Sequence, residues 1–286
     1  MTSEAQGVQG ALLFTPADRP DRFAKGQASS RGRLILDLED GVADESKPAA
    51  RSAVAAWFSG GHSSFVRVNG PATPFFAQDV ETLERLLITD VVLPKVESAA
   101  HLEQARGVWG GARIYPLIET AVGLRNIHEI ARGPGVSQLM LGALDLHADL
   151  GVTFPNSALL SHARLALVIA SRAAGLAPPV DTPHPAIAEN DAVACDAQDA
   201  AAFGFVAKLC IHPTQVAVVD RAFLPSEAQL AWAREIVAAA SGGGVVLVRG
   251  RMVDAPVVLS ARRTLARAEL LSPPAGNDGH EALRRS

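Results

Sequence analysis

Short apolar runs rich in β-branched residues alternate along the chain with longer stretches in which apolar residues recur at helical spacing. This alternation of strand and helix is typical of α/β proteins with a parallel sheet. The predicted strands are Ala11–Phe14, Arg33–Leu38, Ser64–Val68, Asp90–Pro94, Arg113–Ile118, Gln138–Gly142, Pro179–Thr182 and Lys208–Ile211. Eight strands with helices between them, in a chain of 286 residues, predict a (β/α)8 TIM barrel.

Helical periodicity marks the segments that separate these strands. The first such segment follows Asp44 and Ser46, which are residue types that favour the start of a helix. The predicted helices are Lys47–Phe58, Phe75–Leu87, Ala99–Val108, Leu124–Ala131, Ser157–Ala174 and Ala188–Phe203. Each lies between two predicted strands, as a parallel βαβ unit requires.

The pattern changes after the eighth strand. A helix, a glycine break, a hairpin and a second helix are predicted in turn at Ser226–Ala240, Gly242–Gly244, Val245–Val253 and Pro256–Leu270. We therefore divide the chain into a barrel (1–222), a helix–hairpin–helix extension (223–270) and a polar tail (271–286) that is expected to be disordered. The extension is too short to bury a core of its own, so we expect it to pack on its own barrel or on a neighbouring subunit.

The composition is that of an ordinary soluble globular protein, with 48% hydrophobic residues, 20% charged residues and a net charge of −4. Lys and Arg are scattered rather than clustered, which argues against nucleic acid as a partner. No apolar stretch has the length of a membrane span, and the first residues lack the features of a secretory signal. The two cysteines are sparse, as in a reducing compartment, so we expect a cytoplasmic location.

The ends of the predicted strands are unusually polar. Their charged and polar residues are Asp37, Glu39, Asp40, Arg67, Asn69, Lys95, Glu97, Glu119, Asp145, Asp181, His184 and His212. Active sites of (β/α)8 barrels lie at the carboxyl ends of the strands, so we expect these residues to converge there, with Asp181 among the substrate-binding groups. So many acids in one place would repel one another unless a cation bound between them.

Glu119 and Asp145 form the most specific pair, because they end the adjacent fifth and sixth strands. Mg²⁺ prefers oxygen ligands and commonly takes one or two carboxylates, with water and substrate oxygens completing its octahedron. Mn²⁺ accepts similar ligands and could substitute for it. Alternatively, each carboxylate only caps the helix that follows it. Zinc is disfavoured because the histidines and cysteines show no metal-binding spacing.

Two cationic residues at strand ends are candidate substrate ligands. Arg67 should direct its guanidinium into the barrel mouth, where it could bind a carboxylate or a thioester oxygen. Alternatively, it forms an internal salt bridge with the acids of the second strand. Lys95 could bind substrate or could simply pair with the nearby Glu97.

The turn before Asp145 is a candidate anion-binding site. Gly142, Ala143 and Leu144 could present successive backbone N–H groups to a substrate carboxylate at the start of a helix. A tight turn that requires a small residue explains the same sequence equally well.

With these residues assembled, the sequence resembles the citrate lyase beta-subunit-like branch of the HpcH/HpaI aldolase/citrate lyase family. The resemblance covers nearly the whole chain, and its motifs occur in the family's order. They are LLFTPADRPDRFAKG, LDLEDGVADESKPAAR, FVRVNG, VVLPKVES, PLIETAVGL, GALDLHADLG, GFVAKLCIHPTQ and GRMVDAPVV. Each motif is weak by itself, whereas the ordered set is highly specific.

The resemblance implies a magnesium-dependent barrel that cleaves or forms a carbon–carbon bond beside a thioester or an oxo acid. It assigns Glu119 and Asp145 as metal ligands, Arg67 as the catalytic, substrate-binding arginine, and Asp254 as a catalytic acid/base that a neighbouring subunit can supply. It also places Glu39 and Asp40 near the metal's waters, where we expect Asp40 to be catalytic and Glu39 to bind substrate. Without the resemblance, Asp254 would be interpreted as the end of a hairpin or the N-cap of the helix that contains Pro256.

Three functions remain open at this point. The first is a lyase acting on a 3-hydroxyacyl-CoA thioester such as malyl-, citramalyl- or citryl-CoA. The second is a carrier-dependent citrate lyase subunit or an aldolase of free oxo acids. The third is a non-catalytic assembly or regulatory protein that retains the barrel. The expected partners are a small oxo acid, a CoA thioester and further copies of the chain in a homotrimer or homohexamer.

Overall fold

The computed structural model describes residues 7–240 and 244–271. The chain divides into two compact units, one ending at Phe223 and the other beginning at Leu224. Among the described residues, no helix is long and apolar enough to cross a membrane. The tail predicted to be disordered lies outside the described residues apart from Leu271, which ends a helix, and most of the predicted glycine break also lies outside them.

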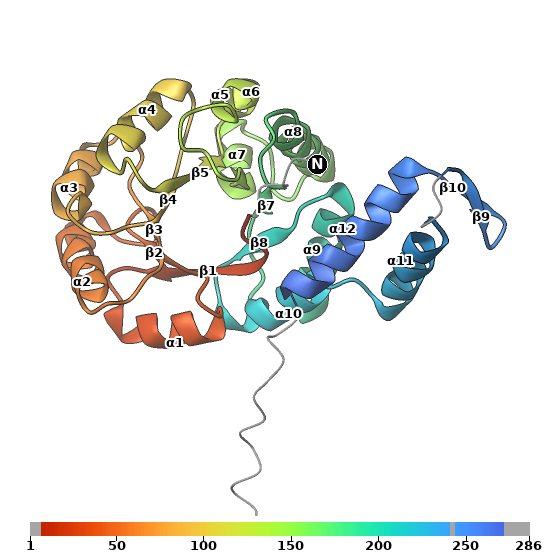
Figure 1. Ribbon diagram of the computed structural model, residues 1–286. Helices are drawn as coiled ribbons and strands as arrows, with labels where there is room; N and C mark the ends of the chain where they lie inside the picture. The colour runs from red at the N-terminus through yellow and green to blue at the C-terminus, as the bar shows by residue number, and fades with distance from the viewer. Residues whose placement is uncertain (1–6, 241–243, 272–286) are drawn as a thin grey trace, which may run out of the picture. The chain divides into compact units, whose positions relative to one another are not determined.

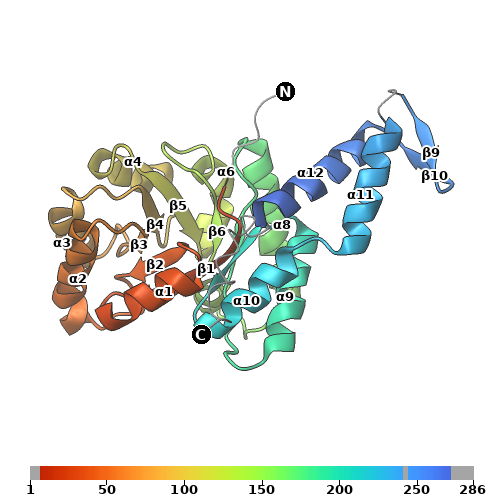
Figure 2. The ribbon, with the colours of Figure 1, turned by 60° about the horizontal axis from the view of Figure 1, so that its bottom comes forward.

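The first unit is a closed barrel of eight parallel strands with helices around it (Figures 1 and 2). The strands are β1 (Gly10–Pro16), β2 (Leu34–Asp37), β3 (Phe65–Arg67), β4 (Asp90–Leu93), β5 (Arg113–Ile118), β6 (Met140–Leu141), β7 (Val180–Asp181) and β8 (Ala207–Cys210). Each strand pairs with the next, and β8 closes on β1. The predicted (β/α)8 barrel is therefore confirmed.

The helices of this unit follow the strands in chain order. They are α1 (Phe23–Ser29), α2 (Lys47–Ser59), α3 (Pro74–Leu83), α4 (Ala99–Val108), α5 (Ala121–Arg125), α6 (Ile127–Ile130), α7 (Ala143–Asp149), α8 (Ser157–Ala173), α9 (Asn190–Phe203) and α10 (Pro213–Phe223), with 3-10 turns at Pro20–Arg22 and Asp44–Ser46. The helix predicted at Leu124–Ala131 is instead two short helices, because Asn126 leaves helical geometry and its side chain donates to the carbonyl of Glu97 at 2.8 Å. Helices α1, α7 and α10 have no counterpart among the predicted ones.

Side-chain alternation along the strands builds the lumen of the barrel. An apolar cluster that includes Ile35, Phe65, Leu117, Met140 and Val180 lies inside it. Because successive side chains of a strand face opposite sides, the residue two positions further along each of these five strands also faces inward. Those residues are Asp37, Arg67, Glu119, Gly142 and Thr182, which we call the mouth ring.

Asp181 lies between Val180 and Thr182, which both face inward, and therefore faces the helices. There it accepts hydrogen bonds from Arg164 of α8 at 3.0 and 2.7 Å and from Lys208 of β8 at 2.6 Å. Asp196 of α9 completes the group, at 2.6 Å from both cations. The prediction that Asp181 binds substrate is thus corrected. Two carboxylates and two cationic side chains neutralise one another outside the lumen.

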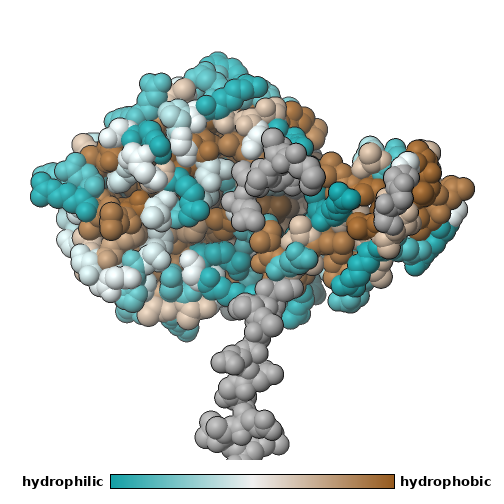
Figure 3. All heavy atoms as spheres, in the orientation of Figure 1, coloured by the Kyte–Doolittle hydropathy of each residue, from teal (hydrophilic) through white to brown (hydrophobic). Residues whose placement is uncertain are grey.

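The second unit contains α11 (Glu227–Ala239), the hairpin strands β9 (Val246–Val248) and β10 (Arg251–Val253), and α12 (Ala255–Leu271). A capping box between Ser226 and Gln229 starts α11. The order of elements in this unit is thus a helix, a hairpin and a second helix. Leu247 and Met252, directly opposite one another across the hairpin, are 77% and 64% exposed, and the surface of this unit carries apolar side chains (Figure 3).

Replacing Asp181 by Asn should destabilise the barrel strongly, because Arg164 and Lys208 would share the single charge of Asp196. Loss of one partner from a buried ionic group typically lowers the free energy of unfolding by about 3–5 kcal/mol. Urea unfolding monitored by circular dichroism would measure the change. Asp21→Asn, which breaks the exposed pair with Arg19, is the control and should change nothing measurable. An unchanged stability of Asp181→Asn, together with weakened substrate binding, would instead return Asp181 to the site.

Candidate active site

Arg67, the last residue of β3, lies at the centre of the barrel mouth. Its Nε and Nη2 donate to the two carboxylate oxygens of Asp37 at 2.7 and 2.6 Å, and its Nη1 lies 3.0 Å from Glu39 Oε2. The guanidinium stacks over the ring of Phe14 at 4.6 Å. The internal salt bridge considered for Arg67 therefore exists. A guanidinium has five N–H groups, however, so three remain beyond the two hydrogen bonds to Asp37.

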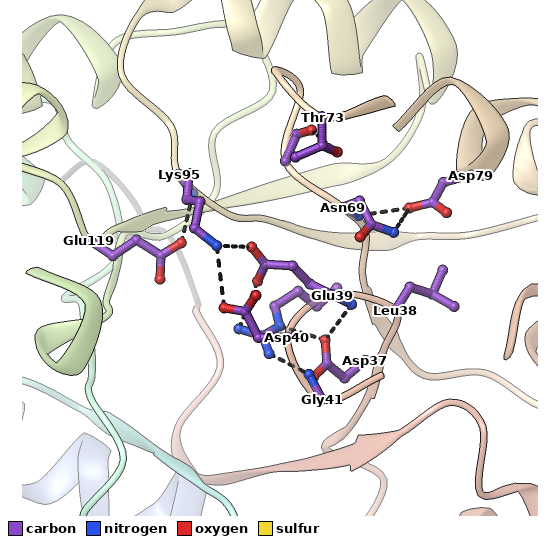
Figure 4. A network of polar contacts seen from close by, with 12 residues as sticks. Asp37, Leu38, Glu39, Asp40, Gly41, Asn69, Thr73, Asp79, Lys95 and Glu119 are labelled. Atoms are coloured by element: carbon purple, nitrogen blue, oxygen red, sulfur yellow. Dashed lines mark hydrogen bonds and ion pairs between the residues drawn. The ribbon is translucent and has the colours of Figure 1, made fainter. Parts of the chain in front are cut away.

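Asp37 stabilises the turn that follows β2. Asp37 also accepts hydrogen bonds from the backbone N–H groups of Glu39 and Gly41, both at 3.0 Å (Figure 4). Burial by itself would raise the pKa of Asp37, but Arg67 and these two N–H groups hold that pKa below its usual value. Asp37 is therefore ionised at neutral pH, and its two oxygens fix the orientation of Arg67.

Lys47 also stabilises this turn, and the sequence did not suggest that role. Its buried ammonium donates to the carbonyls of Leu38 and Glu39 and to Asn69 Oδ1, each at 2.9 Å. All three protons are thereby used. The Lys-Pro pair at the start of α2 gives no indication of this role.

Lys95, just after β4, connects two parts of the site (Figure 4). Its Nζ lies 2.5 Å from Glu39 Oε1 and 3.3 Å from Asp40 Oδ2, so its ionic partners are these acids and not the sequence neighbour Glu97. Its backbone is left-handed, with φ of 51°, and its N–H donates to Glu119 Oε1 at 2.8 Å. One residue therefore neutralises the acidic turn and orients the carboxylate of Glu119.

Glu119 and Asp145 meet in a small cavity of about 50 Å³ at the barrel mouth. The lining residues are Phe14, Arg67, Leu117, Glu119, Gly142, Leu144, Asp145, Thr182, Pro183 and Leu209. Burial raises the pKa of Glu119 well above its usual value, and the carboxylates of Glu39 and Asp145 raise it further, while Arg67 and Lys95 oppose the change. A cation bound beside Glu119 would lower this pKa again and stabilise the carboxylate form.

Gly142 provides the space that the Glu119 carboxylate occupies. A Cβ at position 142 would lie 2.5 Å from Glu119 Oε2 and 2.7 Å from Glu119 Cβ, which is closer than atoms can approach. The glycine is therefore required by its neighbour, and not only by the turn.

The predicted anion cradle is smaller than expected. The N–H of Gly142 donates to the carbonyl of Ile118 at 3.0 Å, and the N–H of Ala143 donates to Thr182 Oγ1, also at 3.0 Å. Of the three predicted groups, only Leu144 retains an N–H without such a partner in the described part of the chain. The hydrogen bonds of the sixth strand and of Thr182 explain the difference.

The residues of the cavity fit a divalent cation. Arg67 and Lys95 form ion pairs with Asp37, Glu39 and Asp40, whereas no ion pair of the described residues involves Glu119 or Asp145. Within residues 7–240 and 244–271, no group of three or more His, Cys, Asp or Glu side chains is arranged to hold a metal ion. Two unpaired carboxylates, with other oxygens completing the shell, match the requirements of Mg²⁺ rather than those of structural Zn²⁺.

Asp254 lies in the second unit. Its carboxylate accepts a hydrogen bond from the N–H of Val257 at 3.4 Å, so it caps α12, as its sequence context by itself indicates. Thr182 of the mouth ring is the lining residue that the strand-end argument missed. The alternation of Val180, Asp181 and Thr182 could have identified it.

The protein is a closed (β/α)8 barrel with two acids and an arginine at the carboxyl ends of its strands. Enzymes of this fold carry their active sites at the same end of the barrel. The chain belongs to the HpcH/HpaI aldolase/citrate lyase family, whose model matches residues 11–213. It is 40% identical over 263 residues to a citrate lyase subunit beta-like protein of Mycobacterium tuberculosis, with 90% of this chain and 94% of the relative covered.

Two further relatives bear on the site. An L-malyl-CoA/beta-methylmalyl-CoA lyase of Cereibacter sphaeroides is 33% identical over 301 residues, covering 91% of this chain and 94% of that protein. The crystal structure of CitE from M. tuberculosis in complex with magnesium, acetoacetate and coenzyme A is 39% identical, with a TM-score of 0.83, and covers 92% of this chain and 99% of its own.

Gly142→Ala should weaken Mg²⁺ binding about 10–100-fold, the range expected when a residue that orients a metal ligand is changed. The added methyl group would displace the Glu119 carboxylate while leaving both ligands in the sequence. Isothermal titration of metal-free protein with Mg²⁺ measures the effect. Gly107→Ala in α4, where a Cβ meets nothing within 4 Å, is the matched control. Equal affinities of the two variants would show that Glu119 does not bind the metal.

Proposed function

We propose that this protein is a Mg²⁺-dependent carbon–carbon lyase that cleaves a 3-hydroxyacyl-CoA thioester, such as malyl-, citramalyl- or citryl-CoA, into an acyl-CoA and an α-oxo acid. The observation that carries the proposal is the convergence of Glu119, Asp145 and Arg67 on one cavity at the barrel mouth. The family, the malyl-CoA lyase relative and the magnesium- and CoA-bound structure of CitE support it.

Glu119 and Asp145 would hold Mg²⁺, which would act as a Lewis acid on the oxygens of the oxo acid. Arg67 is held in place, because two of its N–H groups donate to Asp37 and its Nη1 lies within ion-pair distance of Glu39. Its N–H groups that make no hydrogen bond to Asp37 are suited to stabilise the negative oxygen that develops on the thioester carbonyl. The fixed ion pair thus prepares the charge before the reaction begins.

The cleavage needs two proton transfers. A base removes the proton of the 3-hydroxyl group, the C2–C3 bond breaks, and C3 becomes the carbonyl carbon of the oxo acid. The electrons of that bond pass to the thioester enolate, which takes a proton at C2 and becomes the acyl-CoA. We assign proton transfer to Asp254, supplied by a neighbouring subunit, and the placing of water near the metal to Glu39 and Asp40.

The competing functions differ in their substrate. A carrier-dependent subunit or a free-acid aldolase would share the metal pair but would have no affinity for CoA. The coenzyme A in the related CitE structure favours a CoA substrate. A non-catalytic protein would have no need to keep Glu119, Asp145, Arg67 and Asp254 together in one sequence.

Wild-type protein with Mg²⁺ and malyl-, citramalyl- or citryl-CoA should release an oxo acid while the new acyl-CoA keeps its thioester. Oxo acid measured as its phenylhydrazone and free thiol measured with a disulfide reagent separate the two products. Glu119→Gln should lower the rate about 1000-fold or more, because it removes a metal ligand. Glu103→Gln, an exposed acid of α4, is the control with unchanged activity.

The other outcomes discriminate among the functions. Thiol release equal to oxo acid release would mean that thioester hydrolysis follows cleavage. Cleavage of the free hydroxy acids but not of their CoA esters would indicate a free-acid aldolase. The absence of any Mg²⁺-dependent reaction with these compounds would contradict the lyase proposal.

Asp254 should act across a subunit interface, to which the apolar side chains of Leu247 and Met252 would contribute. Glu119→Gln and Asp254→Asn chains should each be inactive alone. Co-expressed with different tags and purified as mixed oligomers, they should regain turnover, since some sites would combine an intact metal pair with an intact Asp254. Inactive mixed oligomers, or a fully active monomer in sedimentation, would refute action between subunits.

A further inference from the structure

Thr182 is a mouth-ring residue that belongs neither to the acid pair Glu119 and Asp145 nor to the ion pairs of Arg67. It follows the last residue of β7 and faces the lumen, two positions after the core residue Val180. Only 2% of its surface is exposed, and it lines the cavity together with Arg67, Glu119 and Asp145. Its neighbour Asp181 is locked to Arg164 and Lys208, so this strand end has little freedom to move.

The hydroxyl of Thr182 accepts a hydrogen bond but donates none within the described residues. Its oxygen accepts the N–H of Ala143 at 3.0 Å, and within the described residues its proton has no acceptor. A buried hydroxyl whose proton is unpaired is unfavourable unless water or a ligand accepts that proton. Because the Ala143 contact occupies one side of the oxygen, the proton is free to turn toward the cavity.

The groups around Thr182 indicate what it can bind. Pro183, which also lines the cavity, has no N–H, so the hydroxyl is the donor that this strand end presents. Glu119 and Asp145 make the cavity acidic, and a bound cation would draw their oxygens toward itself. A neutral donor beside such a cation suits an anionic oxygen of a metal-bound ligand, and it adds no charge of its own.

We propose that Thr182 contacts the substrate and helps to determine its specificity, by donating its hydroxyl proton to a carboxylate oxygen of the α-oxo acid. This inference rests on the proposed function. Ala143 sets the rotamer of the hydroxyl, and Arg67 remains available for the developing enolate. Two different donors thus serve the two products of one cleavage.

The test compares Thr182→Val, which keeps the shape and removes the hydroxyl, with Thr182→Ser, which keeps the hydroxyl. Isothermal titration would first measure Mg²⁺ alone, and then glyoxylate, pyruvate and oxaloacetate at saturating Mg²⁺. Thr182→Val should bind Mg²⁺ within about twofold of wild type and should bind the oxo acid about 10–100-fold more weakly, the effect of losing a hydrogen bond to a charged group. Thr182→Ser should restore the oxo acid affinity.

Two results would overturn the inference. Unchanged oxo acid binding by Thr182→Val would exclude a contact, and an equal loss of Mg²⁺ affinity would show that Thr182 only positions α7 and Asp145. Thermal unfolding checks that the variants are folded, and Thr182→Ala, which adds no bulk, replaces the valine variant if that one is not. Wild-type protein that binds Mg²⁺ but no oxo acid would instead refute the proposed function.

Discussion

The arrangement of the barrel mouth depends on one constraint, the alternation of side chains along a closed sheet. Closure leaves each strand with one row of side chains in the lumen and one row against the helices. In the lumen rows of β5 and β7, apolar Leu117 and Val180 are followed by polar Glu119 and Thr182, which line the cavity. The same rule sends Asp181 to the opposite side, where only a matched set of charges makes its burial tolerable.

Much of the fold and part of the site could be predicted from the sequence. Strand–helix alternation gave all eight strands, because each strand is a short apolar run between polar turns. The meeting of Glu119 and Asp145 follows from the adjacency of the fifth and sixth strands. Polarity alone could not predict that Thr182, and not Asp181, lies in the site. A shift of one residue along a strand reverses the side on which a side chain lies.

Partners distant in sequence were harder to predict than elements. Lys95 pairs with Glu39, 56 positions away, although Glu97 is the acid beside it in the chain. Lys47 reaches across to Asn69, and the N–H of Ala143 is taken by Thr182. Such choices are made by the closed barrel, which brings neighbouring strand ends together in an order that composition and spacing do not encode.

Two demands at position 95 favour different amino acids, and lysine meets only one of them. Its left-handed backbone is a conformation in which glycine would be relaxed, whereas Glu39 and Asp40 require a long cationic side chain. No single amino acid meets both demands, so we expect few substitutions to be tolerated at this position. Evolution or engineering could loosen the turn after β4 only if a compensating positive charge had already arisen elsewhere around the mouth.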